Sequence, residues 1–291
     1  LGSVENGSTV LTGTTVGINQ NWYIRVPKGY HSTNDNSLRD RNIQIGTNDY
    51  GMHNYAGSEN TYGNVLMGGS IGSDSGASYG YDNVFIGDEA AGGKTNLGRN
   101  NVGIGKRALV SINGGYDNSV VGKYAGFSIT TGIGNSVFGT SAGYEMISCA
   151  NNTVIGNEAG YNIRAGHDNV CVGYRAGKGW GHSENNLNGS RNTYIGAYAG
   201  GSFGNGENNI AIGYNAGFKV LNGALSTLHN RLYIDTGTRA LIASGDPAVY
   251  GATAAGVNSL IYGDQSNTGY SNLYINAYLH IKHSKATDSE G

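Results

Sequence analysis

The sequence contains little proline, cysteine, methionine or charge. Its 291 residues include 2 Pro, 2 Cys and 3 Met, and only 13% are charged. Ordinary soluble domains carry about 25% charged residues, so long amphipathic helices, which need a charged outer face, are not expected. Two cysteines form no disulfide framework, and we interpret Cys149 and Cys171 as unpaired small apolar residues. The scarcity of Pro and the lack of Gly at every third position exclude collagen.

Further absences exclude classes of partner and of chemistry. The 18 Lys and Arg nearly balance the 20 Asp and Glu, so no basic field attracts nucleic acid. No apolar run approaches the roughly 20 residues that span a bilayer, so membrane insertion is not expected. The sequence shows no nucleophile elbow, P-loop, Cys/His metal cluster or recognisable carboxylate pair. We therefore expect no catalytic residues, no cofactor and no enzyme activity.

What the sequence has instead is glycine and a repeat. Gly accounts for 51 residues, more than twice the roughly 7% of ordinary domains, and is interleaved with β-branched and aromatic residues, which argues against disorder. Each repeat reads Asn, two variable residues, an aliphatic residue or Phe, Gly, two more residues and Ala, mostly with a 17-residue period. Its copies start at Asn83, Asn101, Asn118, Asn135, Asn152, Asn169, Asn192 and Asn209. Residues 42–46 and 64–68 keep only the strand half.

Each repeat predicts one coil of a parallel β-roll or β-helix, that is, a β-solenoid. Strand alternation places the residues one and three positions after the Asn on one face, which we predict to be the inward face. The third position is always apolar, so the predicted structural core is Ile86, Ile104, Val121, Phe138, Ile155, Val172, Ile195 and Ile212. The position between them, as in Phe85 and Gly103, is predicted to face outward or into another chain.

The remaining residues of the repeat have expected roles of their own. Gly suits a corner with positive φ or close backbone approach, and the small Ala suits re-entry into a thin core. The Asn residues could form a hydrogen-bonded ladder between coils, or act only as turn formers. A 17-residue coil encloses little apolar volume, so a single rod would bury little area per residue, which favours oligomers.

The repeat Asn-Thr/Ser-x-Ile/Val-Gly-x-x-Ala-Gly, as in residues 152–160, resembles the repeats of phage tail fibres and tail-fibre-domain proteins. It is also similar to the head repeats of trimeric autotransporter adhesins. The resemblance covers roughly residues 42 to 218. It implies an intertwined homotrimeric fibre that projects from a particle or a cell and binds a surface.

Three regions are expected along the chain. Residues 1–41 form an N-terminal connector or cap, residues 42–218 the solenoid, and residues 219–291 a C-terminal trimeric β region. Residues 230–235 and 259–264 resemble the segment that precedes the endosialidase-type intramolecular chaperone of phage fibres and spikes. The opening of that chaperone is not recognisable here, so it was either removed or never present.

The longest spacing, 23 residues before Asn192, marks a candidate receptor site. Six extra residues fall within 178–190, and a loop extruded from a regular rod often carries function. Trp180 could stack on a sugar ring, while His182 and Glu184 could hydrogen-bond its hydroxyl groups. The alternative is a packing loop at the trimer interface.

Two other candidates involve aromatic and imidazole side chains. Tyr144 and Tyr161 directly follow Ala-Gly and could stack on glycans, or else seal coil ends and subunit seams. His280 is the one candidate metal ligand, as one of three imidazoles around a trimer axis, with an exposed or interface His as the alternative. We expect no other metal site.

The resemblance of the repeats implies a structural and receptor-recognition protein. The expected function is a trimeric tail-fibre segment of a phage or phage-like particle, located in the virion or on an extracellular surface, that attaches to a bacterial surface glycan. Neighbouring fibre or baseplate proteins are the other expected partners. A cell-surface trimeric adhesin and a polysaccharide-degrading tailspike are the alternatives.

Overall fold

The computed structural model shows an all-β protein whose central part is a parallel β-solenoid of about eight turns. The structure describes residues 2–5, 8–13, 22–25, 43–47, 61–71, 79–93, 96–179, 188–201, 204–217, 229–234, 261–265 and 271–275. Within these ranges there is no helix. The prediction of an all-β parallel solenoid is therefore confirmed.

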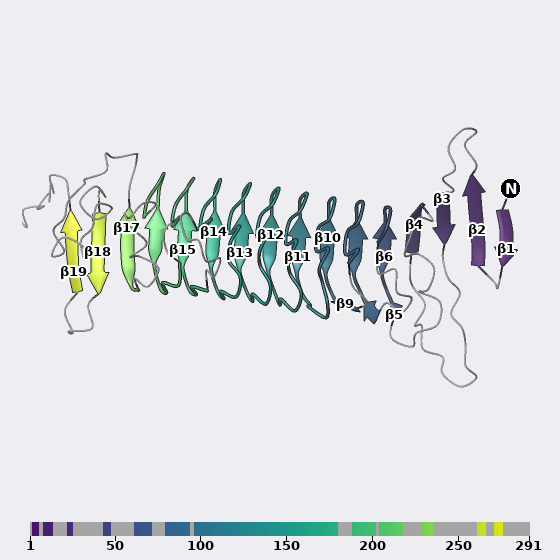
Figure 1. The fold of residues 1–291 in the computed structure, drawn as a ribbon, viewed down its shortest axis with the longest axis horizontal. Coiled ribbons are helices and arrows are strands. Elements are labelled where there is room, and N and C mark those ends of the chain that lie inside the picture. The colour runs from purple at the N-terminus through teal and green to yellow at the C-terminus, as the bar shows by residue number, and fades with distance from the viewer. Residues whose placement is uncertain are drawn as a thin grey trace, which may run out of the picture.

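One sheet of 16 strands runs the length of the molecule (Figure 1). Its strands, in spatial order, are β1 (Gly2–Glu5), β2 (Ser8–Gly13), β3 (Trp22–Arg25), β4 (Ile43–Thr47), β6 (Val65–Met67), β8 (Val84–Ile86), β10 (Val102–Ile104), β11 (Ser119–Val121), β12 (Ser136–Phe138), β13 (Thr153–Ile155), β14 (Val170–Val172), β15 (Thr193–Ile195), β16 (Ile210–Ile212), β17 (Arg231–Ile234), β18 (Ile261–Gln265) and β19 (Ser271–Ile275). From β4 to β17 every pairing is parallel. The parallel ladder thus includes one strand beyond residue 218.

The two ends of the sheet are antiparallel. Strands β1 to β4 pair antiparallel at one end, and β17 to β19 do so at the other. A smaller parallel sheet in the first coils contains β5 (Thr61–Tyr62), β7 (Tyr79–Tyr81) and β9 (Asn96–Arg99). Isolated bridges from Arg99 to His167 continue it along the rod. Each coil is therefore a strand on the main sheet, a bend, and a return segment.

The strand faces are the reverse of the sequence prediction. Positions are counted here from the Asn of each coil, so position 2 lies two residues after it. The position-2 side chains, from Leu66 to Ala211, are buried and at most 3% exposed, whereas those at positions 1 and 3 lie on the outer face. The eight residues predicted as core are half-buried or exposed instead: Ile86, Ile104, Val121, Phe138, Ile155, Val172, Ile195 and Ile212.

The physical reason for this reversal is the buried Asn. Position 0 shares a face with position 2 by strand alternation, and from Asn64 to Asn209 this amide is at most 2% exposed. From Asn83 to Asn209 the backbone N–H of each Asn donates to Oδ1 of the preceding Asn. The side-chain Nδ2 does so as well in every one of these residues except Asn101, and up to Asn192 it also donates to a backbone carbonyl. The ladder ends where the backbone N–H of Arg231 donates to Oδ1 of Asn209. The hydrogen-bonded ladder is confirmed, and its amides need the interior.

The other repeat residues behave as predicted. The position-7 residues are completely buried: Ala90, Ala108, Ala125, Ala142, Ala159, Ala176, Ala199 and Ala216. The position-4 Gly residues have φ between 114° and 149°. At Gly139, for example, an added Cβ would lie 2.4 Å from the carbonyl oxygen of Gly156 in the next coil. Both expected reasons for this Gly, the backbone angle and the close approach, therefore hold.

The variable volumes at position 2 balance between neighbouring coils. A Cβ on Gly103 would lie 2.8 Å from Cδ1 of Phe85, so the large ring uses space that the glycine leaves empty. Tyr194 likewise occupies the space beside Gly177 of the preceding coil, where a Cβ would lie 3.0 Å from Cδ2 of the ring. The core is filled across coils, which is why no single residue size recurs at this position.

Candidate functional site

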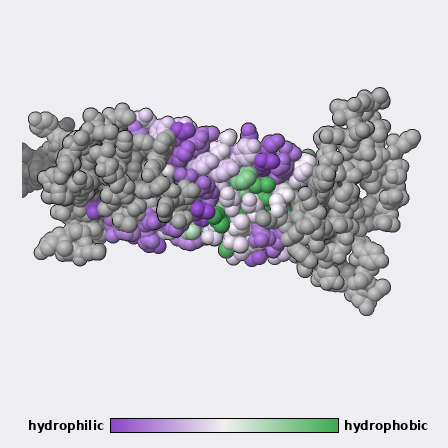
Figure 2. Space-filling view, viewed as in Figure 1, coloured by the Kyte–Doolittle hydropathy of each residue, from purple (hydrophilic) through white to green (hydrophobic). Residues whose placement is uncertain are grey.

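The first surface with functional potential is the outer face of the main sheet. Its position-3 column is apolar in every coil, and Phe138, Ile155, Ile195 and Ile212 are 38% to 41% exposed. At position 1, Ile210 is 41% exposed, while Ser119, Ser136 and Thr153 add hydroxyl groups. Figure 2 shows hydrophobic side chains gathered beside hydrophilic ones on part of the rod surface. Contiguous apolar surface of this kind marks interaction sites.

The predicted receptor loop falls largely outside the described residues. Trp180, His182 and Glu184 all belong to that undescribed part, so their expected glycan contact stays a prediction. The flanks are in register with the neighbouring coils. Nδ2 of Asn162 donates to the carbonyl of Gly179 at 3.0 Å, and the backbone N–H of Asn188 donates to Oδ1 of Asn205 at 3.0 Å.

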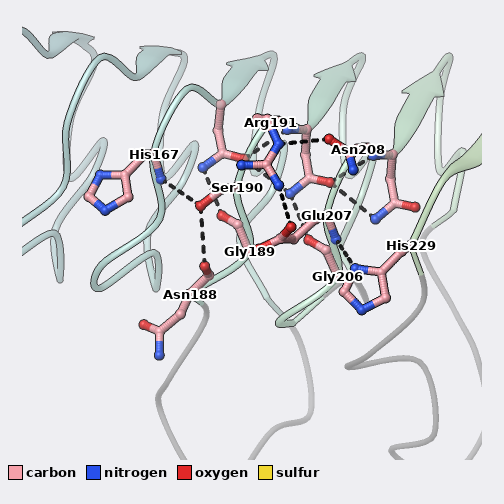
Figure 3. Close-up of polar contacts among 12 residues, drawn as sticks. His167, Asn188, Gly189, Ser190, Arg191, Gly206, Glu207, Asn208 and His229 are labelled. Carbon is pink, nitrogen blue, oxygen red and sulfur yellow. Dashed lines mark hydrogen bonds and ion pairs between the residues drawn. The ribbon is translucent and has the colours of Figure 1, made fainter.

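A polar corner lies where the chain resumes after this loop (Figure 3). The hydroxyl of Ser190 accepts from the backbone N–H of His167 at 3.1 Å. It contacts the backbone of that residue and not its imidazole, so this pair lacks the hydrogen bond between nucleophile and base that acyl transfer requires. In the next coils Arg191 forms an ion pair with Glu207, whose backbone N–H donates to Nδ1 of His229 at 3.0 Å. These contacts join successive coils and hold their register.

The predicted aromatic candidates form a stacked column at position 9. The ring centroids of Phe127 and Tyr144 are 4.7 Å apart and those of Tyr144 and Tyr161 are 4.9 Å apart, each pair with an interplanar angle of 6°. Nζ of Lys178 lies 5.0 Å from the centroid of Tyr161. Burial is the main cause that raises the pKa of Tyr161. Because these rings cover one another's faces, they favour the sealing role over sugar stacking, which needs a free ring face.

A neighbouring corner carries residues that the repeat pattern did not single out. Tyr174 and Tyr214, both at position 5, are 41% and 45% exposed. Tyr198, at position 6 of the coil between them, makes edge contacts with both, at centroid distances of 5.2 and 6.2 Å and interplanar angles of 85°. We name these three side chains the tyrosine corner. The signal for it was a column of Tyr, Ala and Tyr at position 5, which becomes visible only when three coils are aligned.

Charged residues border the tyrosine corner. Nε of Arg175 donates to Glu158 at 2.8 Å, and Lys178 forms a second ion pair with the same carboxylate. Hydrogen bonds from Arg175 and then Lys178 are the main causes that lower the pKa of Glu158. The guanidinium carbon of Arg175 lies 4.8 Å from the ring centroid of Tyr174 and 6.0 Å from that of Tyr198. The rings therefore rest against a side chain that an ion pair holds in place.

The remaining candidates offer no chemistry in the part of the chain that the structure describes. His280 lies outside that part, and within it no group of three His, Cys, Asp or Glu side chains could hold a metal ion. Cys149 and Cys171 are unpaired and buried, as predicted. Burial raises the pKa of both thiols to about 12, so neither is a thiolate near neutral pH.

No protein-family model, curated protein or solved structure matches this chain. Among the described residues, no helix is long and apolar enough to cross a membrane.

Proposed function

We propose that this chain is a segment of a homotrimeric fibre, carried by a phage or a phage-like particle, that attaches the particle to a bacterial surface. The threefold assembly and the particle come from the resemblance of the repeats. The observation that carries the proposal is the exposed apolar column at position 3 of the main sheet. In this reading the protein is structural, without catalysis, and lies in the virion or on an extracellular surface.

The geometry of the column suits assembly with other copies of the chain. The strands from β4 to β17 pair in register, so the position-3 side chains form one continuous column along the rod. Copies related by an axis parallel to the rod present the same column to one another. The position-1 hydroxyls of Ser119, Ser136 and Thr153 border it and can form hydrogen bonds at the edge of such an interface.

Covering these exposed apolar side chains would stabilise an assembly by several kcal/mol per chain. Fully burying an Ile or Phe side chain is worth about 1.5 to 3 kcal/mol, so covering a side chain that is about 40% exposed gives roughly 0.6 to 1.2 kcal/mol. Phe138, Ile155, Ile195, Ile210 and Ile212 together then contribute about 3 to 6 kcal/mol per chain. A cyclic trimer gains this amount on each of its chains.

The rod shape of the protein also supports the proposed attachment to a bacterial surface. A rod that exposes side chains along its length can present many weak contacts to a repetitive surface such as a bacterial polysaccharide, and three copies multiply them. Neighbouring fibre or baseplate proteins are the other partners in this proposal.

The decisive measurement is the solution mass by light scattering at low micromolar concentration. We expect three times the chain mass of 30.3 kDa. The variant Ile155→Lys places a charge in the exposed column without touching the core and should dissociate the trimer, whereas Asn157→Lys, exposed in the same coil but off the sheet, should leave it intact. A monomeric or dimeric wild type, or a trimeric Ile155→Lys variant, contradicts the proposed assembly.

Attachment needs its own test. Fluorescently labelled wild-type trimer is mixed with a panel of Gram-negative and Gram-positive bacteria, and cell-bound fluorescence is measured. Saturable binding to at least one strain is expected. A trimer that binds none of them would contradict a receptor-binding role for this segment.

A further inference from the structure

The tyrosine corner contains Tyr174 and Tyr214, the two tyrosines that are exposed among the side chains the structure describes. Tyr174 and Tyr214 belong to one column, with the small Ala197 in the coil between them. Adjacent coils are spaced by about 4.8 Å in a β-sheet, so these two residues lie about 10 Å apart along the rod. Tyr198 lies beside both rings and contacts them edge to face. The three rings therefore form a continuous aromatic surface two coils long.

The rings are held in place before any ligand arrives. The guanidinium of Arg175 lies over the rings of Tyr174 and Tyr198, and its own position is fixed by Glu158 in the preceding coil. The backbone N–H groups of Tyr198 and Asn215 donate to carbonyls of the preceding coil at 2.9 and 3.0 Å, so the supporting bends are ordered as well. A preordered aromatic surface loses little conformational entropy on binding.

The chemistry of this surface is unlike that of its two neighbours. The stacked column of Phe127, Tyr144 and Tyr161 has its ring faces covered. The aliphatic column at position 3 is apolar throughout. At the corner, exposed ring carbon and phenolic hydroxyl groups occur together, and this combination suits a ligand that has apolar C–H faces and a rim of hydroxyl groups. A pyranose sugar has both.

We infer that the tyrosine corner binds the pyranose rings of a polysaccharide laid along the rod, with sugar C–H groups on Tyr174 and Tyr214 and sugar hydroxyls on their phenol groups. The inference rests on the proposed function, since it names the part of the fibre that meets the bacterial surface. The alternative occupant of these rings is a second copy of the chain at a subunit seam, and the test separates the two.

The experiment measures binding of the full chain to purified lipopolysaccharide O-chain and capsular polysaccharides immobilised as a panel. Positive members are then studied in solution by saturation-transfer NMR. The variant Tyr174→Ala/Tyr214→Ala should lose at least tenfold in affinity for a polysaccharide that the wild type binds. Tyr174→Phe/Tyr214→Phe keeps the rings and should lose only a few-fold. Tyr144→Phe, in the stacked column, is the matched control and should bind like the wild type.

The possible results distinguish a failure of the proposed sugar-binding site from a failure of the fibre proposal. Wild-type affinity in the double alanine variant would overturn the site, as would a wild type that binds bacterial cells but no polysaccharide. If the double alanine variant loses its trimeric mass, the rings belong to a subunit seam and the inference also fails. A wild type that is monomeric or binds no cells overturns the fibre proposal, whatever the tyrosine variants do.

Discussion

Removing one amide from the buried Asn ladder should destabilise this protein far more than removing an exposed amide from the same coil. Asn152 donates through Nδ2 to Asn135 at 2.9 Å, to the carbonyl of Ala150 at 3.0 Å and to the carbonyl of Gly166 at 2.9 Å. Its Oδ1 accepts from the backbone N–H of Asn169 at 2.9 Å and from Nδ2 of the same residue at 3.0 Å. The variant Asn152→Ala removes all of these bonds.

The cost follows from the groups that lose their partners. The backbone N–H of Asn169 and the carbonyl of Gly166 both lose the side-chain partner described above, beside Asn side chains that are at most 1% exposed. An orphaned buried group costs about 1 to 3 kcal/mol, so Asn152→Ala should cost about 2 to 6 kcal/mol. Asn152→Asp keeps the acceptor but cannot donate and buries a charge, so it should cost more at neutral pH and recover partly in acid.

Urea unfolding followed by far-UV circular dichroism gives the free energies, with Asn157→Ala as the exposed control, which should change stability by no more than about 0.5 kcal/mol. Because solenoids can unfold coil by coil, hydrogen exchange should locate the damage to the coils of Asn152 and Asn169. If Asn152→Ala costs no more than Asn157→Ala, the ladder does not stabilise the coils as argued.

Three further predictions concern the backbone and the thiols. Gly139→Ala should abolish folding or cost more than about 3 kcal/mol in urea unfolding, since its Cβ would meet the Gly156 carbonyl at 2.4 Å; a stable variant would contradict the close approach. Ser141→Gly should raise stability by up to about 1 kcal/mol, because Ser141 holds a φ of 53° that L-residues disfavour; a loss of stability would show that its side chain matters more than its backbone angle. Burial raises the thiol pKa of Cys149 and Cys171 to about 12, against about 8.5 in an unfolded chain, so above about pH 8.5 only the unfolded chain releases these protons and stability should fall towards pH 12. The double Cys→Ala variant should show a smaller fall in urea midpoint between pH 8 and pH 10, and an equal fall would refute the thiol contribution.

The period and the corner residues of the fold could be predicted because each has a local physical cause. A Gly that recurs at one position and an Ala three residues later constrain the backbone of every coil, so the repeat alone indicates where the chain turns and where it re-enters the core. The antiparallel pairing of β17, β18 and β19 has no comparable signal, since it depends on contacts between strands that no longer repeat.

The candidate site was harder to predict, because it depends on which coils lie side by side. Tyr174, Tyr198 and Tyr214 occupy two different positions of three different coils, and no single repeat contains the group. The stacking of Tyr144 on Tyr161 follows directly from the 17-residue period, but the period does not show that stacking removes the ring faces from a ligand. Only the distances and interplanar angles between the rings show that their faces are covered.

The reversal of the strand faces shows what alternation can and cannot decide. Alternation divides a strand into two sets of side chains, but it does not say which set is inside, and in this chain both sets are rich in apolar residues. Choosing the more uniformly apolar set gave the wrong face. The polar residue decides the matter: an Asn that repeats in register can satisfy both amide groups only between stacked coils, and such a ladder is protected from water in the interior. Since position 0 and position 2 share a face, a ladder of Asn64 to Asn209 places the variable position inside. The uniform aliphatic column at position 3 must then lie outside, where a regular apolar surface is useful only if another molecule covers it.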